Sequence, residues 1–314
     1  AASDVYKRQV GSSRRVWVTI RETLVLLCIA IGLTPAFKMK FWNIGAEGQI
    51  LMGGMATAAL MIYAGDAMPN WLLLILIFIA SAAAGLIWGL IPAVFKAYFN
   101  TNETLFTLML NYVAMQLVTF AIVFWENPSG SNTVGIINAA GQKGWFPSIF
   151  GNMYGLNVIV VLIITLGMYV YMKYSKQGYE IAVVGESQNT ARYAGINVKK
   201  VIIRTMMLSG AICGIAGCLI VSGASHTIST STAGGRGFTA IIVAWMSKFN
   251  PFAMILVSAF LVFMQQGSIQ IASQFGLNEN ASDIITGILL FFLIGCEFFI
   301  NYKLEWKKNH KEGK

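Results

Sequence analysis

Polar side chains that interrupt apolar runs are the first candidates for chemistry in this sequence. Eight of them carry an amide, a hydroxyl or a carboxylate: Asn43, Glu47, Gln49, Thr104, Thr107, Asn111, Gln266 and Gln270. Thr104, Thr107 and Asn111 recur at spacings of three and four, which places them on one face of a helix. Uncharged groups of this kind within a membrane favour a path for a polar, neutral solute. Hydrogen bonding between neighbouring helices is the alternative for each of them.

Enzyme and metal motifs are absent from the sequence. It has neither the GxxxxGKS/T loop that holds nucleotide phosphates nor the HExxH and GxSxG motifs. His226 and His310 have no acidic cluster nearby, and the four cysteines lie singly in apolar runs, so no metal site is indicated. We therefore expect no catalytic residue, no metal and no cofactor. Any energy source must come from elsewhere.

The composition identifies the class of protein. Of 314 residues, 56% are hydrophobic and 11% are charged, whereas soluble domains carry roughly 25% charged residues. The excess of 22 Lys and Arg over 13 Asp and Glu lies in short loops between apolar runs. That pattern is typical of a protein that spans a membrane several times. We expect contact with membrane lipid and none with nucleic acid.

Eight apolar runs approach the length of about 20 residues that a spanning helix needs. They cover residues 23–37, 44–64, 71–95, 104–125, 154–172, 201–223, 252–272 and 284–302. The run 238–247 is too short to span, so we expect a re-entrant or broken half-helix there. The sequence thus predicts an all-α, polytopic membrane protein whose transmembrane domain covers residues 17–302.

Small residues recur at helical spacing in several of these runs. Gly210, Gly214 and Gly217 follow one another at steps of four and three, and Gly85 and Gly89 repeat the step of four. Small residues let helix backbones approach closely within a membrane. We expect these faces to be helix contacts in a tight bundle.

The distribution of Lys and Arg predicts the orientation. The loop 173–204 and the tail 303–314 are rich in both, so each should be cytoplasmic, the C-terminus included. Alternating the spans leaves five basic residues before residue 22 on the outer side, against this rule. We therefore interpret residues 1–16 as a non-native or truncated segment and expect a first spanning helix to be missing. A native tail with inverted charge is the alternative.

The inner loop 175–200 contains the signals of a short surface helix. Ser187 is placed to cap a helix from Gln188 to Tyr193, and Gly195 is placed to end it. Asn197 is placed to cap the helix that follows. A short helix on the cytoplasmic surface is a feature to which a partner protein can bind.

Four segments together resemble a known family. The string Asn-Ile-Gly-Ala-Glu-Gly-Gln at residues 43–49 is similar to the signature of permease subunits of ATP-binding-cassette (ABC) importers. Segments 101–112, 184–196 and 237–251 fit the same family in its usual order. The family includes branched-chain amino acid, ribose and nucleoside permeases, and the nucleoside and simple-sugar subgroup is the nearest. The chain departs from it in Thr104, where an aliphatic residue is usual, and in the first helix that we expect to be missing.

The resemblance implies a permease subunit in a bacterial plasma membrane. Its partners would be an ABC ATPase subunit, a second permease that is identical or a paralogue, and an extracytoplasmic substrate-binding protein or lipoprotein. Nucleosides are the expected solute, ahead of simple sugars and then amino acids. The resemblance also implies that the inner loop couples to the ATPase through Glu186, Ser187, Arg192, Tyr193 and Gly195.

Two other classes of membrane protein stay open on the sequence alone. An ion-coupled secondary carrier would need an intramembrane Asp, Glu or His, and the nearest candidates lie at helix ends. A non-transporting scaffold subunit would not need the face of amides and hydroxyls.

Overall fold

The computed structural model describes residues 13–149 and 153–276, and residues 284, 287, 288, 291, 292 and 295. The helices are α2 (Ser13–Lys38), α3 (Ala46–Ala64), α4 (Asn70–Phe99), α5 (Glu103–Trp125), α6 (Gly155–Tyr174), α7 (Lys176–Glu186), α8 (Gln188–Tyr193), α9 (Val198–Ile220), a π turn η1 (Val221–Ser225), α10 (Arg236–Met246) and α11 (Pro251–Gln274). Residues 1–12 and the tail 303–314 lie outside the described residues, and so does most of the predicted run 284–302.

Among the described residues, six helices are long and apolar enough to cross a membrane. They are α2 from Arg15, α4, α5, α6, α9 with η1, and α11. The predicted run 44–64 forms α3, whose 19 residues are rich in glycine and alanine. The chain divides into two compact units, residues 20–259 and residues 1–19 with 260–314. The sequence-based expectation of an all-helical membrane fold is confirmed.

Within residues 20–259, α3, α4 and α9 pack through glycines. A Cβ at Gly85 would collide with the carbonyl oxygen of Gly210, and one at Gly53 with the carbonyl oxygen of Gly214. At Gly89 a Cβ would lie 2.8 Å from the Met206 carbonyl oxygen. The helices therefore touch backbone to backbone, and the contact predicted from the glycine spacing is confirmed.

The predicted half-helix at 238–247 is also confirmed, as α10. It begins after Gly235, whose φ of +74° is a conformation that favours glycine. It ends at Met246 after 11 residues, which at 1.5 Å per residue is too short to span. Lys248 and Phe249 then take positive φ values, and α11 starts at Pro251.

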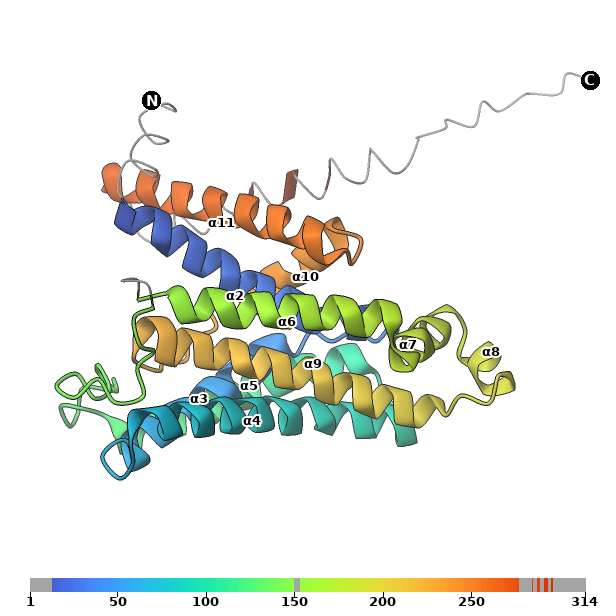
Figure 1. Cartoon of the computed structure of the whole chain (residues 1–314), viewed down its shortest axis with the longest axis horizontal. Coiled ribbons are helices and arrows are strands. Elements are labelled where there is room, and N and C mark those ends of the chain that lie inside the picture. The colour runs from blue at the N-terminus through green and yellow to red at the C-terminus, as the bar shows by residue number, and fades with distance from the viewer. Residues whose placement is uncertain are drawn as a thin grey trace, which may run out of the picture. The chain divides into compact units, whose positions relative to one another are not determined.

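The two ends of the helices carry different connections (Figure 1). The loop between α5 and α6 lies at one end, and α7 and α8 lie at the other. In that loop, the Asn138 side chain donates to the carbonyl oxygen of Met61 at 2.7 Å. Trp145 stacks on His226 with ring centroids 3.7 Å apart. The loop is thus held against the ends of α3 and η1.

Candidate functional site

A buried cluster of polar side chains lies where the segment after α2 leads into α3. It comprises Asn43, Gln49, Thr107 and Asn111, and we call it the amide cluster. The Asn43 Oδ1 atom accepts from the Gly45 backbone N–H at 3.0 Å, and its Nδ2 atom donates to Ser209 Oγ at 3.3 Å. Asn43 and Gln49 also pair through their amides at 3.4 Å. Both side chains are fully buried, so these contacts replace the water that the amides lose.

Two members of the amide cluster come from α5 and bind backbone groups of the α3 segment. The Asn111 side chain accepts from the Gly48 N–H and donates to the Ile44 carbonyl, both at 2.9 Å. Thr107 Oγ1 accepts from the Ile44 N–H at 3.2 Å and donates to the Glu103 carbonyl oxygen at 2.8 Å. The first N–H groups of a helix have no partner within it. The predicted face of α5 therefore supplies partners at the start of α3.

Thr104 borders this cluster, because its carbonyl oxygen accepts from Thr107 Oγ1 at 3.2 Å, and two other predicted residues lie in the other unit. Thr104 is half-buried, and its backbone N–H donates to the Asn102 side chain that caps α5. Gln266 and Gln270 belong to the part of α11 in the second compact unit, where both are half-buried. The structure thus brings together Thr107 and Asn111 with Asn43 and Gln49.

Glu47 connects α3 to the start of α10. Its Oε1 atom accepts from the Gly237 backbone N–H at 2.8 Å, and its side chain is almost completely buried. Glu47 also lies in the first turn of α3. A helix N-terminus carries a partial positive charge and unsatisfied N–H groups. The Glu47 carboxylate therefore lies at the positive N-termini of both α3 and α10.

Arg236, the first residue of α10, forms an ion pair that the sequence analysis missed. Its guanidinium donates to Glu22 Oε2 at 2.7 Å, and the other oxygen of Glu22 accepts from Arg21 at 2.5 Å. Arg21 also lies over the Tyr154 ring, 5.3 Å from its centroid. No spacing rule in the sequence links Arg236 to α2. Glu22 could have indicated this ion pair, because it is an acidic residue inside a segment long enough to span a membrane.

One hydrogen-bond donor beside the amide cluster has no partner. The buried Trp88 Nε1 atom makes no hydrogen bond within the part of the chain that the structure describes. A Cβ at Gly48 would lie 2.8 Å from it and 3.0 Å from Asn111 Oδ1. An unpaired buried donor costs about 1–3 kcal/mol. Trp88 therefore offers a free polar group at the edge of the cluster.

The inner loop forms a second candidate site, at the end of the molecule that carries α7 and α8. Ser187 Oγ accepts from the Thr190 N–H at 3.2 Å, and α8 covers Gln188–Tyr193, so the predicted cap and helix are confirmed. Gly195 follows with φ +77°. The helix α7 was not predicted from the sequence. Residues Glu186, Ser187, Arg192, Tyr193 and Gly195 follow one another along this loop.

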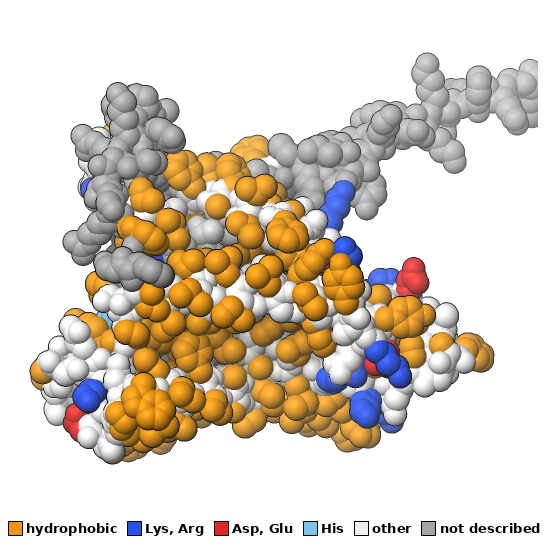
Figure 2. Space-filling model, in the orientation of Figure 1, with side chains coloured by type: hydrophobic (Ala, Val, Ile, Leu, Met, Phe, Trp, Pro, Cys, Tyr) orange, Lys and Arg blue, Asp and Glu red, His pale blue; other side chains and the backbone are white. Residues whose placement is uncertain are grey.

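Exposure and charge distinguish this end of the molecule. Tyr193 is 94% exposed, and Ala191 is the one residue of α8 that is buried. Figure 2 shows hydrophobic side chains over the lateral face of the helices and Lys and Arg side chains gathered near α7 and α8. Arg192 and Tyr193 are thus exposed beside a basic surface.

Comparison with known proteins assigns the family. Residues 18–294 match the family described as the permease component of the branched-chain amino acid transport system. The chain belongs to this family. Its match covers the amide cluster, Glu47, α10 and the inner loop, so the resemblance seen in the sequence is confirmed.

Curated relatives cover most of this permease. It is 30% identical over 286 residues to the guanosine ABC transporter permease protein NupP of Bacillus subtilis, covering 90% of this chain and 82% of the relative. It is 26% identical over 310 residues to the nucleoside ABC transporter permease protein NupB of Lactococcus lactis, covering 96% and 84%. A glucose ABC transporter permease protein of Haloferax volcanii is 28% identical over 294 residues, covering 90% and 76%. No solved structure matches the chain.

These relatives are permease subunits of ABC transporters for nucleosides and sugars. Such subunits form a membrane pathway and are not themselves catalytic. The chain is accordingly a multi-pass membrane permease of the ABC importer type.

Proposed function

We propose that this permease imports nucleosides. Relatives named for guanosine and for nucleosides align over 90% and 96% of this chain, and this is the observation that carries the proposal. The glucose relative keeps simple sugars as the second candidate. Both solutes are polar and neutral, which agrees with the uncharged side chains of the amide cluster.

We further propose that the amide cluster borders the solute path, together with Glu47 and Thr104. Gln266 and Gln270, in the other compact unit, stay candidates from the sequence alone. In the conformation described, Asn43, Gln49, Thr107 and Asn111 satisfy one another or nearby backbone groups. This favours a closed path at that depth, with the solute exchanging for some of these bonds when it opens. The unpaired Trp88 Nε1 supports the idea, because a solute or water can accept a hydrogen bond from this N–H group.

The inner loop is proposed to couple this path to an ATPase subunit on the cytoplasmic side. Tyr and Arg are enriched among residues that anchor protein interfaces. Tyr193 and Arg192 both project from a helix that contributes one buried residue to its own chain. A second permease, identical or a paralogue, and an extracytoplasmic binding protein would complete the assembly in a bacterial plasma membrane, with the C-terminus cytoplasmic.

Uptake into proteoliposomes tests the proposed function. The permease is reconstituted with its ATPase, second permease and binding protein, and uptake of labelled guanosine, glucose and leucine is compared. We expect uptake of guanosine that requires ATP. Uptake of glucose alone would contradict the nucleoside assignment. Uptake driven by an ion gradient without ATPase would identify a secondary carrier instead.

The coupling proposal has its own variant. Arg192→Ala with Tyr193→Ala should lower ATP-driven uptake at least tenfold while membrane insertion and folded yield stay normal. Ile136→Ala, in the loop at the other end and 62% exposed, is the control and should leave assembly with the ATPase unchanged. Normal uptake in the double variant would contradict the proposal.

A further inference from the structure

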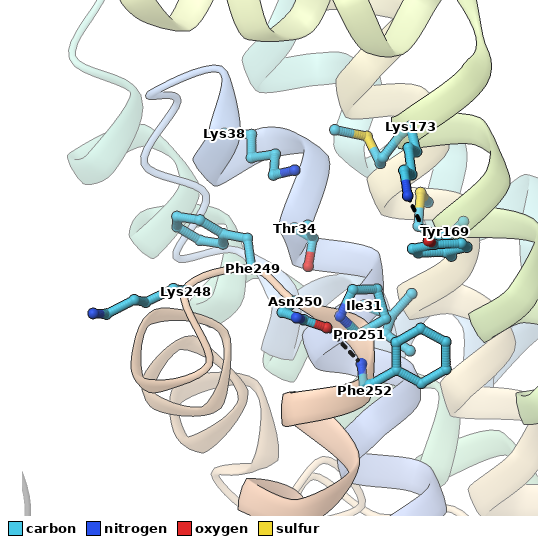
Figure 3. A pocket seen from close by; sticks show the side chains of 12 residues that line it. Ile31, Thr34, Lys38, Tyr169, Lys173, Lys248, Phe249, Asn250, Pro251 and Phe252 are labelled. Carbon is cyan, nitrogen blue, oxygen red and sulfur yellow. Dashed lines mark hydrogen bonds between the residues drawn. The ribbon is translucent and has the colours of Figure 1, made fainter.

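A cavity of about 520 Å³ lies between α2, α6 and the turn that joins α10 to α11 (Figure 3). Its apolar wall includes Ile31, Met168 and Phe252, and its polar wall includes Lys38 and Lys173. Phe252 is 54% exposed, so the apolar side continues into the lateral surface of the helices. The cavity therefore combines a basic rim with a wall suited to hydrocarbon.

Three lysines surround the cavity, and no acidic residue of the described chain lines it. Lys38 ends α2, Lys173 lies in the last turn of α6, and Lys248 lies in the turn after α10. None of the three forms a salt bridge within the described residues. In Figure 3, Lys38 and Lys173 project toward the space between α2 and α6, whereas Lys248 points away from it.

Neighbouring groups add to the positive potential at the rim. Lys173 Nζ donates to the Tyr169 hydroxyl at 3.0 Å, which holds its ammonium beside the cavity. The N-terminus of the 24-residue helix α11 also opens here, with Asn250 accepting from the Phe252 N–H at 3.0 Å. A helix N-terminus favours negative charge. The Lys173 ammonium and the positive end of α11 therefore both favour an anion.

The position of the cavity points to a lipid as the source of that anion. The rim lies at the same ends of α2 and α6 as the basic inner loop, which is the cytoplasmic end in the orientation proposed above. Lysines at this level meet the phosphates of the inner leaflet, and basic pockets between spanning helices suit anionic headgroups. The apolar wall offers contact for an acyl chain, which a free phosphate ion would not use.

We propose that this cavity binds the phosphate headgroup of an anionic phospholipid from the cytoplasmic leaflet. Lys38 and Lys173 contact the phosphate oxygens, and an acyl chain runs along Met168 and Phe252. The bound lipid then contacts α2, α6 and the turn that follows α10, and it stabilises their packing. Transport would therefore depend on anionic lipid, because α10 also carries the contact with Glu47.

Native mass spectrometry of the purified full chain tests the site without requiring transport, so its outcome is independent of the proposed solute. The probes are dioleoyl phosphatidylglycerol, dioleoyl phosphatidylcholine and inorganic phosphate. Wild-type protein should retain phosphatidylglycerol in preference to phosphatidylcholine. Lys38→Gln with Lys173→Gln should weaken that binding about fivefold for each lysine removed. Lys40→Gln with Lys176→Gln is the matched control, because both lysines are exposed and lie outside the cavity.

Three results would overturn the proposal: no preference for phosphatidylglycerol, an equal loss in the control pair, or displacement of the lipid by millimolar inorganic phosphate. If the lysine pair fails to fold, wild-type protein is photocrosslinked to a phosphatidylglycerol that carries a diazirine near its headgroup. The label should fall on peptides containing residues 168–173 or 248–252, and label confined to other segments would contradict the site.

Discussion

The crossing of α4 over α9 and the start of α10 are held by opposite means. At the crossing, Gly85, Gly210 and Gly214 bring backbones into direct contact, and no Cβ fits between them. At the start of α10, the contacts are a hydrogen bond from Gly237 to Glu47 and an ion pair from Arg236 to Glu22. The helix contact in the first region depends on close packing of the backbones. The contact in the second region depends on charged side chains.

The difference shows which part of the permease is able to rearrange. Close-packed contacts are lost when the helices separate by a small distance, so the glycine crossing acts as a fixed frame. Charge-assisted hydrogen bonds are strong, yet each can be exchanged for a bond to water, solute or another residue. We infer that the start of α10 moves relative to a fixed frame of α3, α4 and α9.

The largest effect is expected where the frame is broken. Gly85→Ala places a Cβ against the Gly210 carbonyl oxygen, so α4 and α9 must separate. We expect a loss of about 3 kcal/mol or more in stability, as for severe overpacking. Gly167→Ala on α6 is the control, because a Cβ there meets nothing within 4 Å. Thermal unfolding in detergent measures both, and equal stability in the two variants would contradict the fixed frame.

The charged region should respond unequally to loss of its acid and its base. Glu22→Gln leaves both Arg21 and Arg236 without their counter-charge, whereas Arg236→Gln leaves Glu22 paired with Arg21. Removing one partner from a fully buried pair costs about 3–5 kcal/mol, so about 2 kcal/mol is expected for Glu22→Gln in this half-buried pair. Arg236→Gln should cost less. Unfolding of both single variants and the double variant decides this, and a larger loss in Arg236→Gln would refute it.

Trp88 offers a sharper test of what the amide cluster does. Its Nε1 donor has no partner in the described chain, so Trp88→Phe removes no internal hydrogen bond. We expect folded yield to change little and uptake per folded complex to fall about fivefold, which corresponds to a bond of about 1 kcal/mol. Unchanged specific uptake would place Trp88 outside the path.

The smallest effect concerns His226, the residue that follows η1. Burial lowers the pKa of His226 below its ordinary value of 6.5, and the positive charge of Arg21 lowers it further. The folded state therefore resists protonation, so stability is greatest above about pH 6.5 and falls as the pH drops through the lowered pKa. Unfolding temperature measured from pH 7.5 to 5.5 should fall slightly in wild type. His226→Gln should flatten that dependence, and an identical slope in both would show that another group titrates.

Local signals in the sequence were enough to predict several parts of the molecule. The glycine steps in α4 and α9 predicted a helix contact because only close backbones require them. Ser187 and Asn197 predicted helix starts because a side-chain acceptor must follow a fixed spacing to reach the N–H groups. The short run at 238–247 predicted a half-helix because its length cannot cross a membrane.

Contacts between distant segments were beyond sequence reasoning. Glu47 reaches Gly237, and Glu22 reaches Arg236, more than 180 residues away in each case. No spacing rule relates such positions, so Glu47 was assigned to the path without its contact to α10. The unpaired Trp88 donor was missed because its environment depends on Gly48 and α5, which come together only in the folded chain.

The Glu47→Gln variant tests the central claim most directly, which is that the start of α10 serves transport while the glycine frame serves folding. Glutamine keeps an acceptor for the Gly237 N–H and removes the negative charge between two helix N-termini. ATP-driven nucleoside uptake per folded complex is measured beside Glu126→Gln, in the loop between α5 and α6, as the control. We predict at least a tenfold loss of specific uptake for Glu47→Gln, with stability within about 1 kcal/mol of wild type. Normal specific uptake, or a loss that follows the amount of folded protein, would contradict the account.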